Sequence, residues 1–235
     1  MRVSAVPLAL AMILLSVQSA QTQGDPALPK PRAVDPRRVD DAIRNGVEFL
    51  KTSDSPSWAF GINNTDELIL LTLISAGIPE ENPRVKELLT KILEAPLETT
   101  YKVAAQAMAL EELHRVKYQW RILQCAQYLV DNQAKNGQWS YGTPTEIPKD
   151  LSVPTGSANR PSEPTVNRGA RNFNGEKREK PKVDQTVKIK KRRDGPRAGD
   201  NSNPQYAALG LRACHDAGAL FPAEIIHAAR NWWIE

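Results

Sequence analysis

Three neighbouring residues, Cys214, His215 and Asp216, have the side chains of a zinc site. A metal-binding pair on a helix needs a spacing of three or four residues, because immediate neighbours point in different directions. We therefore expect no metal site here, and we expect Cys214 to be a small core residue. The chain holds no Gly-x-Ser-x-Gly, P-loop or His-Glu-x-x-His string. No catalytic residue is assigned, and no cofactor is expected.

A second group of residues has side chains suited to ligand binding at helix starts. Helix N-termini attract anionic and carbonyl groups, so such residues can mark a binding site. We expect them to gather at one end of the fold, at the mouth of a cavity; helix capping alone is the alternative interpretation. The candidate cavity-mouth residues are Asn64, Asp66, Asp200, Asn201 and Asn203.

The N-terminus has the pattern of an export signal. Arg2 precedes an apolar run over residues 6–17 that ends in small and polar residues, which is typical of a secretory signal peptide. The run is shorter than the roughly 20 residues that a membrane span needs. We predict a signal peptide over 1–20 and a flexible leader over 21–35, and thus a periplasmic or secreted protein. An uncleaved anchor is the alternative.

The two cysteines, Cys125 and Cys214, could form a disulfide in an oxidising compartment. Each lies in a separate apolar helix of the predicted fold. Unpaired cysteines are therefore the favoured interpretation, and a disulfide remains the alternative.

Positive charge is concentrated in residues 143–200, which hold 14 Lys and Arg against 8 Asp and Glu. The rest of the chain has 17 basic and 19 acidic residues, so a +6 segment interrupts a −2 body. With only eight large aliphatic or Phe side chains, this segment is predicted to be a disordered basic insertion. A membrane surface is a candidate partner for this segment. Nucleic acid is not expected, because Phe173 is the only aromatic residue of residues 143–200 on which a base could stack. The basic residues concerned are Lys188, Lys190, Lys191, Arg192 and Arg193.

Outside the insertion, the spacing of apolar residues predicts an all-α fold. Helices are expected over residues 36–50, 64–77, 83–93, 100–114, 118–134, 204–218 and 221–235. Amphipathic helices alternate with helices that are apolar nearly all round, as an outer layer on an inner layer requires. Leu50, Leu89 and Leu129 recur at 39 and 40 residues in the amphipathic helices, which indicates helical repeats.

The most specific motif begins at Tyr128-Leu129 and continues with Gln133, Gly137 and Trp139. It resembles the QW repeat of the terpenoid cyclases and protein prenyltransferases, and the chain is similar to bacterial prenyltransferase/squalene oxidase repeat-containing proteins. The resemblance implies that these residues lock an outer helix to the next inner helix. A Gln can satisfy free amides at a helix start, a Gly permits a sharp exit, and a Trp buries a large area.

The family resemblance implies an α/α toroid, here a partial ring over residues 36–142 that continues over 201–235 and stops within a repeat. The family's acidic Asp-x-Asp-Asp string and zinc site are absent from the sequence. We therefore expect a non-catalytic binding or scaffold module for a hydrophobic small molecule or a protein partner. The alternative is the N-terminal part of a terpenoid-cyclase- or prenyltransferase-like enzyme that acts on isoprenoid substrates.

Overall fold

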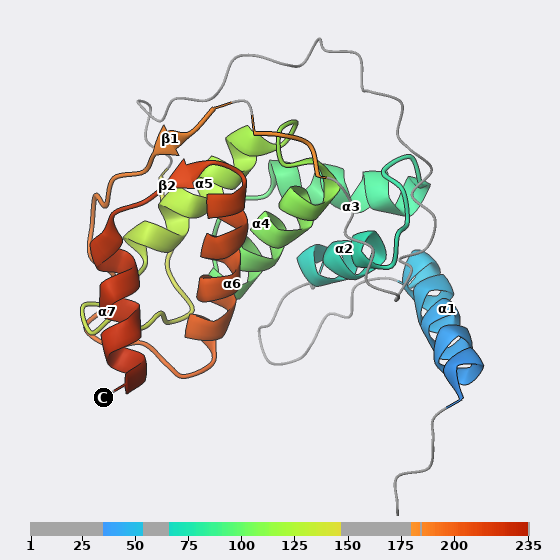
Figure 1. Ribbon diagram of the computed structural model, residues 1–235, viewed down its shortest axis with the longest axis horizontal. Coiled ribbons are helices and arrows are strands. Elements are labelled where there is room, and N and C mark those ends of the chain that lie inside the picture. Colours follow the sequence, from blue (N-terminus) through green and yellow to red (C-terminus); the bar gives the residue numbers. More distant parts are fainter. Residues whose placement is uncertain (1–34, 54–65, 147–179, 184, 235) are drawn as a thin grey trace, which may run out of the picture.

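The computed structural model describes residues 35–53, 66–146, 180–183 and 185–234. The predicted signal peptide and nearly all of the leader lie outside these residues. Most of the described chain is helical, as the sequence predicts, with two short strands added (Figure 1). The elements are α1 (Pro36–Thr52), α2 (Asp66–Ser75), α3 (Pro83–Glu94), α4 (Thr100–His114), α5 (Gln119–Asp131), β1 (Val187–Lys188), α6 (Asn203–Asp216), β2 (Ala219–Leu220) and α7 (Ala223–Ile234).

Side-chain caps define where two of the helices begin. The Asp35 side chain accepts a hydrogen bond from the backbone amide of Arg37 at 3.0 Å, and Asn82 does the same for Arg84 at 3.0 Å. A proline follows each cap, where its missing amide is not needed. These local signals explain why the starts of α1 and α3 agree with the sequence prediction.

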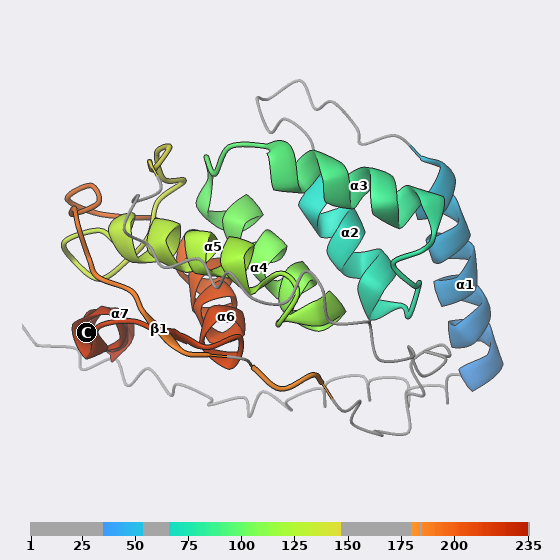
Figure 2. The same cartoon turned by 90° about the horizontal axis from the view of Figure 1, so that it is seen from above.

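Helices α2, α4 and α6 pack side by side in one row, with α4 in the middle (Figures 1 and 2). Helix α3 packs on α2, and α5 packs on both α4 and α6. The rings of Tyr101 and Tyr206 meet edge to face at 6.4 Å near the starts of α4 and α6, so these two helices run in parallel. A Cβ atom at Gly210 would lie 2.7 Å from the Cα of Ala104, which shows how closely they approach.

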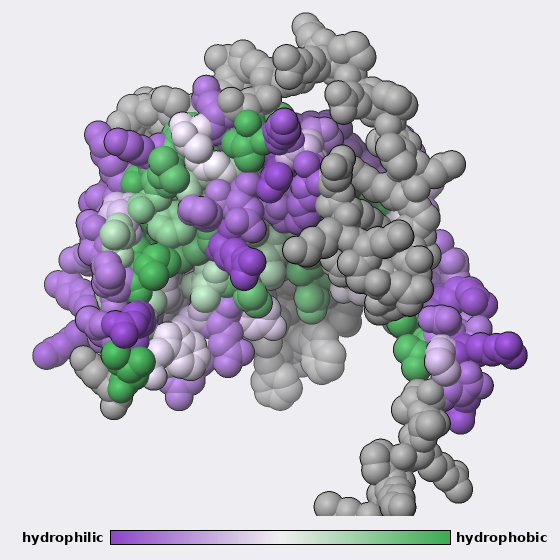
Figure 3. Space-filling view, viewed as in Figure 1, coloured by the Kyte–Doolittle hydropathy of each residue, from purple (hydrophilic) through white to green (hydrophobic). Residues whose placement is uncertain are grey.

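The hydrophobic core lies mainly among α2, α3, α4 and α5, whose largest fully buried side chains include Leu70, Leu88 and Leu110. Helix α1 contributes little, because it has no buried residue and packs mainly on α2. Its apolar stripe is therefore partly exposed, and Phe49 is 67% exposed. At the opposite end of the molecule, apolar residues of α6 and α7 lie among hydrophilic ones on the surface (Figure 3).

The prediction of a disordered insertion over 143–200 is wrong for residues 180–183 and 185–200, which we call the strap. Here β1 pairs in parallel with β2, and the amide of Val187 donates to the carbonyl of Gly218 at 2.9 Å. Val187 and Ile189 are buried, and exposed Lys188 lies between them. Composition averaged over the whole segment hides this short alternation, which is typical of a strand. Residues 147–179 of the insertion lie outside the described chain.

The strap covers the polar side of α5, which the sequence predicts to face solvent as an outer helix. Gln127 donates from its side chain to the carbonyl of Lys190 at 2.7 Å, and the amide of Arg192 donates to the carboxylate of Asp131 at 2.8 Å. Eleven of the 13 residues of α5 are buried as a result. Buried polar groups need such partners, so the strap and α5 depend on one another.

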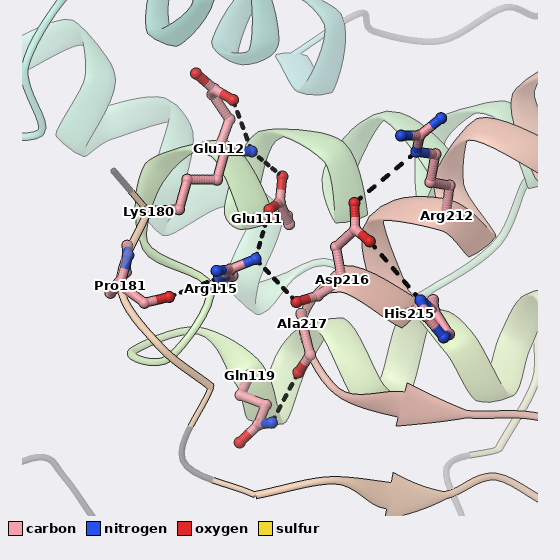
Figure 4. Close-up of polar contacts among 10 residues, drawn as sticks. All are labelled: Glu111, Glu112, Arg115, Gln119, Lys180, Pro181, Arg212, His215, Asp216 and Ala217. Carbon is pink, nitrogen blue, oxygen red and sulfur yellow. Dashed lines mark hydrogen bonds and ion pairs between the residues drawn. The ribbon is translucent and has the colours of Figure 1, made fainter. Parts of the chain in front are cut away.

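The strap begins at the C-terminal ends of α4 and α6 (Figure 4). Lys180 bridges Glu111 and Glu112 at 2.5 and 3.0 Å. Arg115 donates to the carbonyl of Pro181 at 2.6 Å and to that of Asp216 at 3.1 Å. Positive side chains are favourable at helix C-terminal ends, where free carbonyls carry partial negative charge. These ion pairs and hydrogen bonds thus hold the start of the strap against the C-terminal ends of α4 and α6.

The strap should resist trypsin although it is rich in Lys and Arg, because cleavage requires local unfolding. We predict slow cleavage at Lys188–Arg193 in the native protein and fast cleavage in Ile189→Asp, which places a charge at a site that is 3% exposed. Mass spectrometry of timed digests measures this. Thr186→Asp, at an exposed position, is the matched control and should cleave slowly. Immediate cleavage of the native strap would contradict its packing.

Candidate functional site

The QW-like motif joins the end of α5 to α7 through Gln133 and Gly137, and to the start of α6 through Trp139. The side-chain amide of Gln133 donates to the carbonyl of Ile225 at 2.8 Å and to that of Gly137 at 3.2 Å. Gln133 is expected to satisfy free amides at a neighbouring helix start; its side-chain amide instead donates to a carbonyl near the start of α7. Gly137 has φ +90°, and a Cβ atom there would lie 2.2 Å from the carbonyl oxygen of Ala228. The glycine lets the chain turn sharply against the α7 backbone.

The remaining residues of the motif are buried at the end of α5. The indole of Trp139 donates to the carbonyl of Leu129 at 2.8 Å, and the Tyr128 hydroxyl donates to the carbonyl of Glu98 at 2.7 Å. The carbonyl of Trp139 accepts from the amide of Asp200, just before α6 begins. These contacts position helices and leave no side chain directed at a ligand, so the motif is structural.

The polar residues before α6 cap that helix. Asp200 accepts from the backbone amides of Ser202 and Asn203 at 2.9 and 3.0 Å, and the Asn203 side chain donates to it at 2.7 Å. Burial raises the pKa of Asp200, but these hydrogen bonds outweigh it and leave the pKa below its usual value. Asn201 accepts from Gln138 at 3.3 Å. The capping interpretation fits Asp200, with Asn203 bound to it, whereas Asn201 contacts Gln138 instead; Asn64 lies outside the described residues.

Asp66 differs from the other candidates because it lines a cavity of about 250 Å³. The cavity lies where α2 begins, α3 ends and α4 begins. Five of its eight lining residues are charged, and this sets the kind of ligand that it can hold. The lining residues are Asp66, Glu67, Lys91, Ile92, Ala95, Pro96, Glu98 and Lys102.

Glu67 is the most unusual residue of the cavity. It is 9% exposed, and within the described part of the chain its Oε2 has no hydrogen-bond partner. Burial raises the pKa of Glu67 above its ordinary value, against the opposing effects of its own backbone amide and of Lys102. A buried carboxylate without a partner is costly, so its presence calls for an explanation. Sequence reasoning selected Asp66 and missed Glu67, although two successive acids before an apolar run were visible.

Arg121 of α5 holds one wall of the cavity in place. Its guanidinium donates to the carbonyls of Ile92 and Ala95 at 3.0 and 2.6 Å, at the C-terminal end of α3. Gln106 of α4 also donates to the carbonyl of Ile92, at 2.5 Å. Two helices thus fix the end of α3 with buried hydrogen bonds, and the cavity wall is preformed.

Lys102 supplies the opposite charge within the same cavity. It is half-buried, and no ion pair of 4.0 Å or less joins it to Glu67 among the described residues. Lys91 instead pairs with Glu87 at 2.7 Å. The cavity therefore presents a carboxylate and an ammonium group that do not neutralise one another directly.

The two cysteines are unpaired and buried. Burial raises the pKa of Cys125 to about 12, so its thiol stays protonated and is a poor nucleophile. Cys214 lies against the carbonyl of Ile122, whereas the exposed side chains of His215 and Asp216 lie 3.7 Å from one another, so Cys214 is directed away from both. The described residues contain no group of three or more His, Cys, Asp and Glu that could hold a metal ion.

The five basic residues proposed for a membrane surface have different environments in the strap. Arg193 donates to the side chains of Asn132 and Thr145 at 3.0 and 2.5 Å, which gives it a structural role. Lys191 pairs with Asp194 at 3.4 Å. The remaining three are exposed: Lys188, Lys190 and Arg192.

The fold and the site define a predominantly helical protein with a preformed, charged cavity at the start of two helices of its central row. In the part of the chain that the structure describes, no helix has the length and apolar character needed to cross a membrane. Comparisons with protein-family models, curated proteins and solved structures find no match. Function must therefore be argued from the cavity.

Gly137→Ala should lower the free energy of unfolding by about 3 kcal/mol, because it combines an unfavourable backbone conformation with a clash against α7. Chemical denaturation measures the change. Gly46→Ala is the matched control: a Cβ atom there meets nothing within 4 Å, and the exposed position lies inside α1. It should be neutral or stabilise by up to about 1 kcal/mol. Equal stability of both variants would contradict the close approach.

Glu67→Gln should raise the melting temperature at pH 7 by a few degrees, because it removes the cost of a buried charge. The raised pKa means that the folded protein binds this proton more tightly than the unfolded chain does. Stability from this group is therefore lost as pH rises from 4.5 through the raised pKa of Glu67, and the gain in melting temperature should vanish at about pH 4. Thermal unfolding at both pH values tests this. Glu98→Gln, in the same cavity but exposed, should show no such gain; destabilisation by Glu67→Gln would indicate a structural role.

Proposed function

We propose that this protein is an exported α/α-toroid repeat protein that acts as a non-catalytic binding module, with its ligand in the cavity beside Glu67. The arrangement of α2, α4 and α6 in one row, with α3 and α5 packed on them, supports an open arc of helical hairpins. The exposed Leu209, 54% accessible on α6, suits an edge on which a further helix of a longer ring would pack.

The observation that carries the binding role is the buried Oε2 of Glu67 without a partner. Such a group destabilises the free protein, and proteins retain unfavourable groups mainly where function requires them. A ligand that donates to this oxygen would remove the cost on binding. Helix capping explains Glu67 only in part, because its own backbone amide stabilises the carboxylate while Oε2 stays without a partner in the described chain.

The second candidate is a terpenoid-cyclase- or prenyltransferase-like enzyme. A buried carboxyl group with a raised pKa is suited to donate a proton, and this favours the candidate. The lining of the cavity weighs against it, because five charged residues offer no wall for a polyprenyl chain. The same argument favours a polar ligand over a hydrophobic small molecule.

A secondary role at an anionic surface rests on Lys188 and Lys190. Both are exposed on the outward side of the strap, whereas Val187 and Ile189 face inward. Retention on acidic vesicles that falls with added salt would support this role.

Amide NMR spectra recorded with mixtures of small amines, carboxylates and sugars test the binding role. We expect shifts at the residues that line the cavity in the native protein, and their loss in Glu67→Gln. Farnesyl diphosphate is the matched isoprenoid probe and should cause no shift there and no turnover. Shifts only at residues outside the cavity, or reproducible turnover of the isoprenoid, would contradict the proposal.

A further inference from the structure

We infer that the cavity binds a small zwitterion, a molecule with one ammonium and one carboxylate group such as a free α-amino acid. This inference rests on the proposed binding function and adds the class of ligand. It follows from two opposite charges that line one cavity, Glu67 and Lys102, and that form no close ion pair with one another.

Glu67 accounts for the ammonium end of the ligand. Its Oε2 is buried and accepts no hydrogen bond within the described chain, so it lacks a donor that a ligand could supply. An ammonium group provides three donors and a compensating charge, whereas a neutral hydroxyl provides one donor and no charge. The cation is therefore the better partner for this carboxylate.

Lys102 accounts for the carboxylate end. It lies in the first turn of α4, half-buried, and it lines the cavity and has no close ion pair among the described residues. The amides at the start of α4 favour negative charge in the same region. A ligand carboxylate placed here would interact with Lys102 and with the amides at the start of α4. The other lysine of the cavity, Lys91, is already paired with Glu87.

The size and the wall of the cavity fit this class. A volume of about 250 Å³ is smaller than most sites for drug-sized ligands, which begin at roughly 300 Å³, and suits a metabolite with few heavy atoms. Arg121 and Gln106 hold the wall at the end of α3, so little ordering is needed on binding.

Binding should also depend on pH in a defined direction. An ammonium group binds the ionised form of Glu67, and burial favours the protonated form of the free protein. Affinity should therefore rise with pH above 4.5 until Glu67 is ionised. The charged groups that face or influence Glu67 from its own and the neighbouring elements are Asp66 on α2, Lys91 on α3, Glu98 in the loop, Lys102 on α4 and Arg121 on α5.

Calorimetric titration of the full chain with three probes of matched shape tests the inference: L-valine carries both charges, isobutylamine only the ammonium, and isovalerate only the carboxylate. We expect L-valine to bind most tightly. Glu67→Gln should weaken L-valine and isobutylamine by at least about tenfold. Lys102→Met should weaken L-valine by a similar factor and leave isobutylamine unchanged.

Control variants and folding checks keep the test decisive. Glu94→Gln and Lys86→Met change exposed charges on α3 outside the cavity lining and should leave all affinities unchanged. Circular dichroism and the melting temperature confirm that each variant is folded. Loss of the pH dependence in Glu67→Gln would support the inference independently, because a structural role would not move it.

The outcomes separate this inference from the proposed function. Binding of isovalerate alone, with shifts at the cavity, overturns the zwitterion and leaves the binding role intact. Native affinity of Glu67→Gln for L-valine also overturns the zwitterion. Binding of all three probes weaker than about 1 mM overturns the inference; if Glu67→Gln also destabilises the protein, the binding role falls as well.

Discussion

The burial of α4 on every side is the constraint on which the rest of the structure depends. Its small residues let α6 approach until the backbone at Gly210 nearly touches Ala104. A helix so enclosed must find partners for its polar side chains among its neighbours. Thr100 donates to the carbonyl of Ser140 at 2.7 Å, Gln106 binds the end of α3, and Glu111 binds Lys180 of the strap. The few polar residues of α4 thus position the motif, the cavity wall and the strap.

The cavity follows from the same packing. Gln106 and Arg121 donate to the carbonyls at the end of α3. These carbonyls are acceptors, so they offer no donor to the Glu67 carboxylate. The start of α2 brings the Glu67 carboxylate to this site, where its Oε2 has no partner among the described residues. Lys102 interacts with it through charge but not through a close ion pair. The result is a cavity with one wall held by hydrogen bonds and a carboxylate oxygen without a donor, and the proposed binding role rests on this combination.

The sequence predicted where the helices lie, but it did not predict that the strap is ordered. The first depends on neighbouring residues and the second on distant ones. Caps such as Asp35 and Asn82 and the apolar periodicity act locally, so helix bounds can be read from neighbouring residues. The strap is held by Gln127 and Asp131, some 60 residues earlier in the chain, and composition carries no trace of such contacts. Glu67 was missed because its burial depends on where α3 ends. The role given to Gln133 was wrong because α7, and not an inner helix, lies beside it.

The distribution of charge acquires a different meaning once the strap is placed. In the sequence, an insertion with a net charge of +6 interrupts a body with a net charge of −2. This suggests a basic segment that binds an external partner. In the structure, Lys180 pairs with two carboxylates of α4, and Arg193 fixes the loop after α5. Charges engaged in this way stabilise the fold and are not available to a membrane. Only a few exposed side chains of the strap remain for such a surface, whereas side chains of both charges line one cavity of the helical body. The stronger recognition chemistry therefore lies in the slightly acidic helical body rather than in the basic segment.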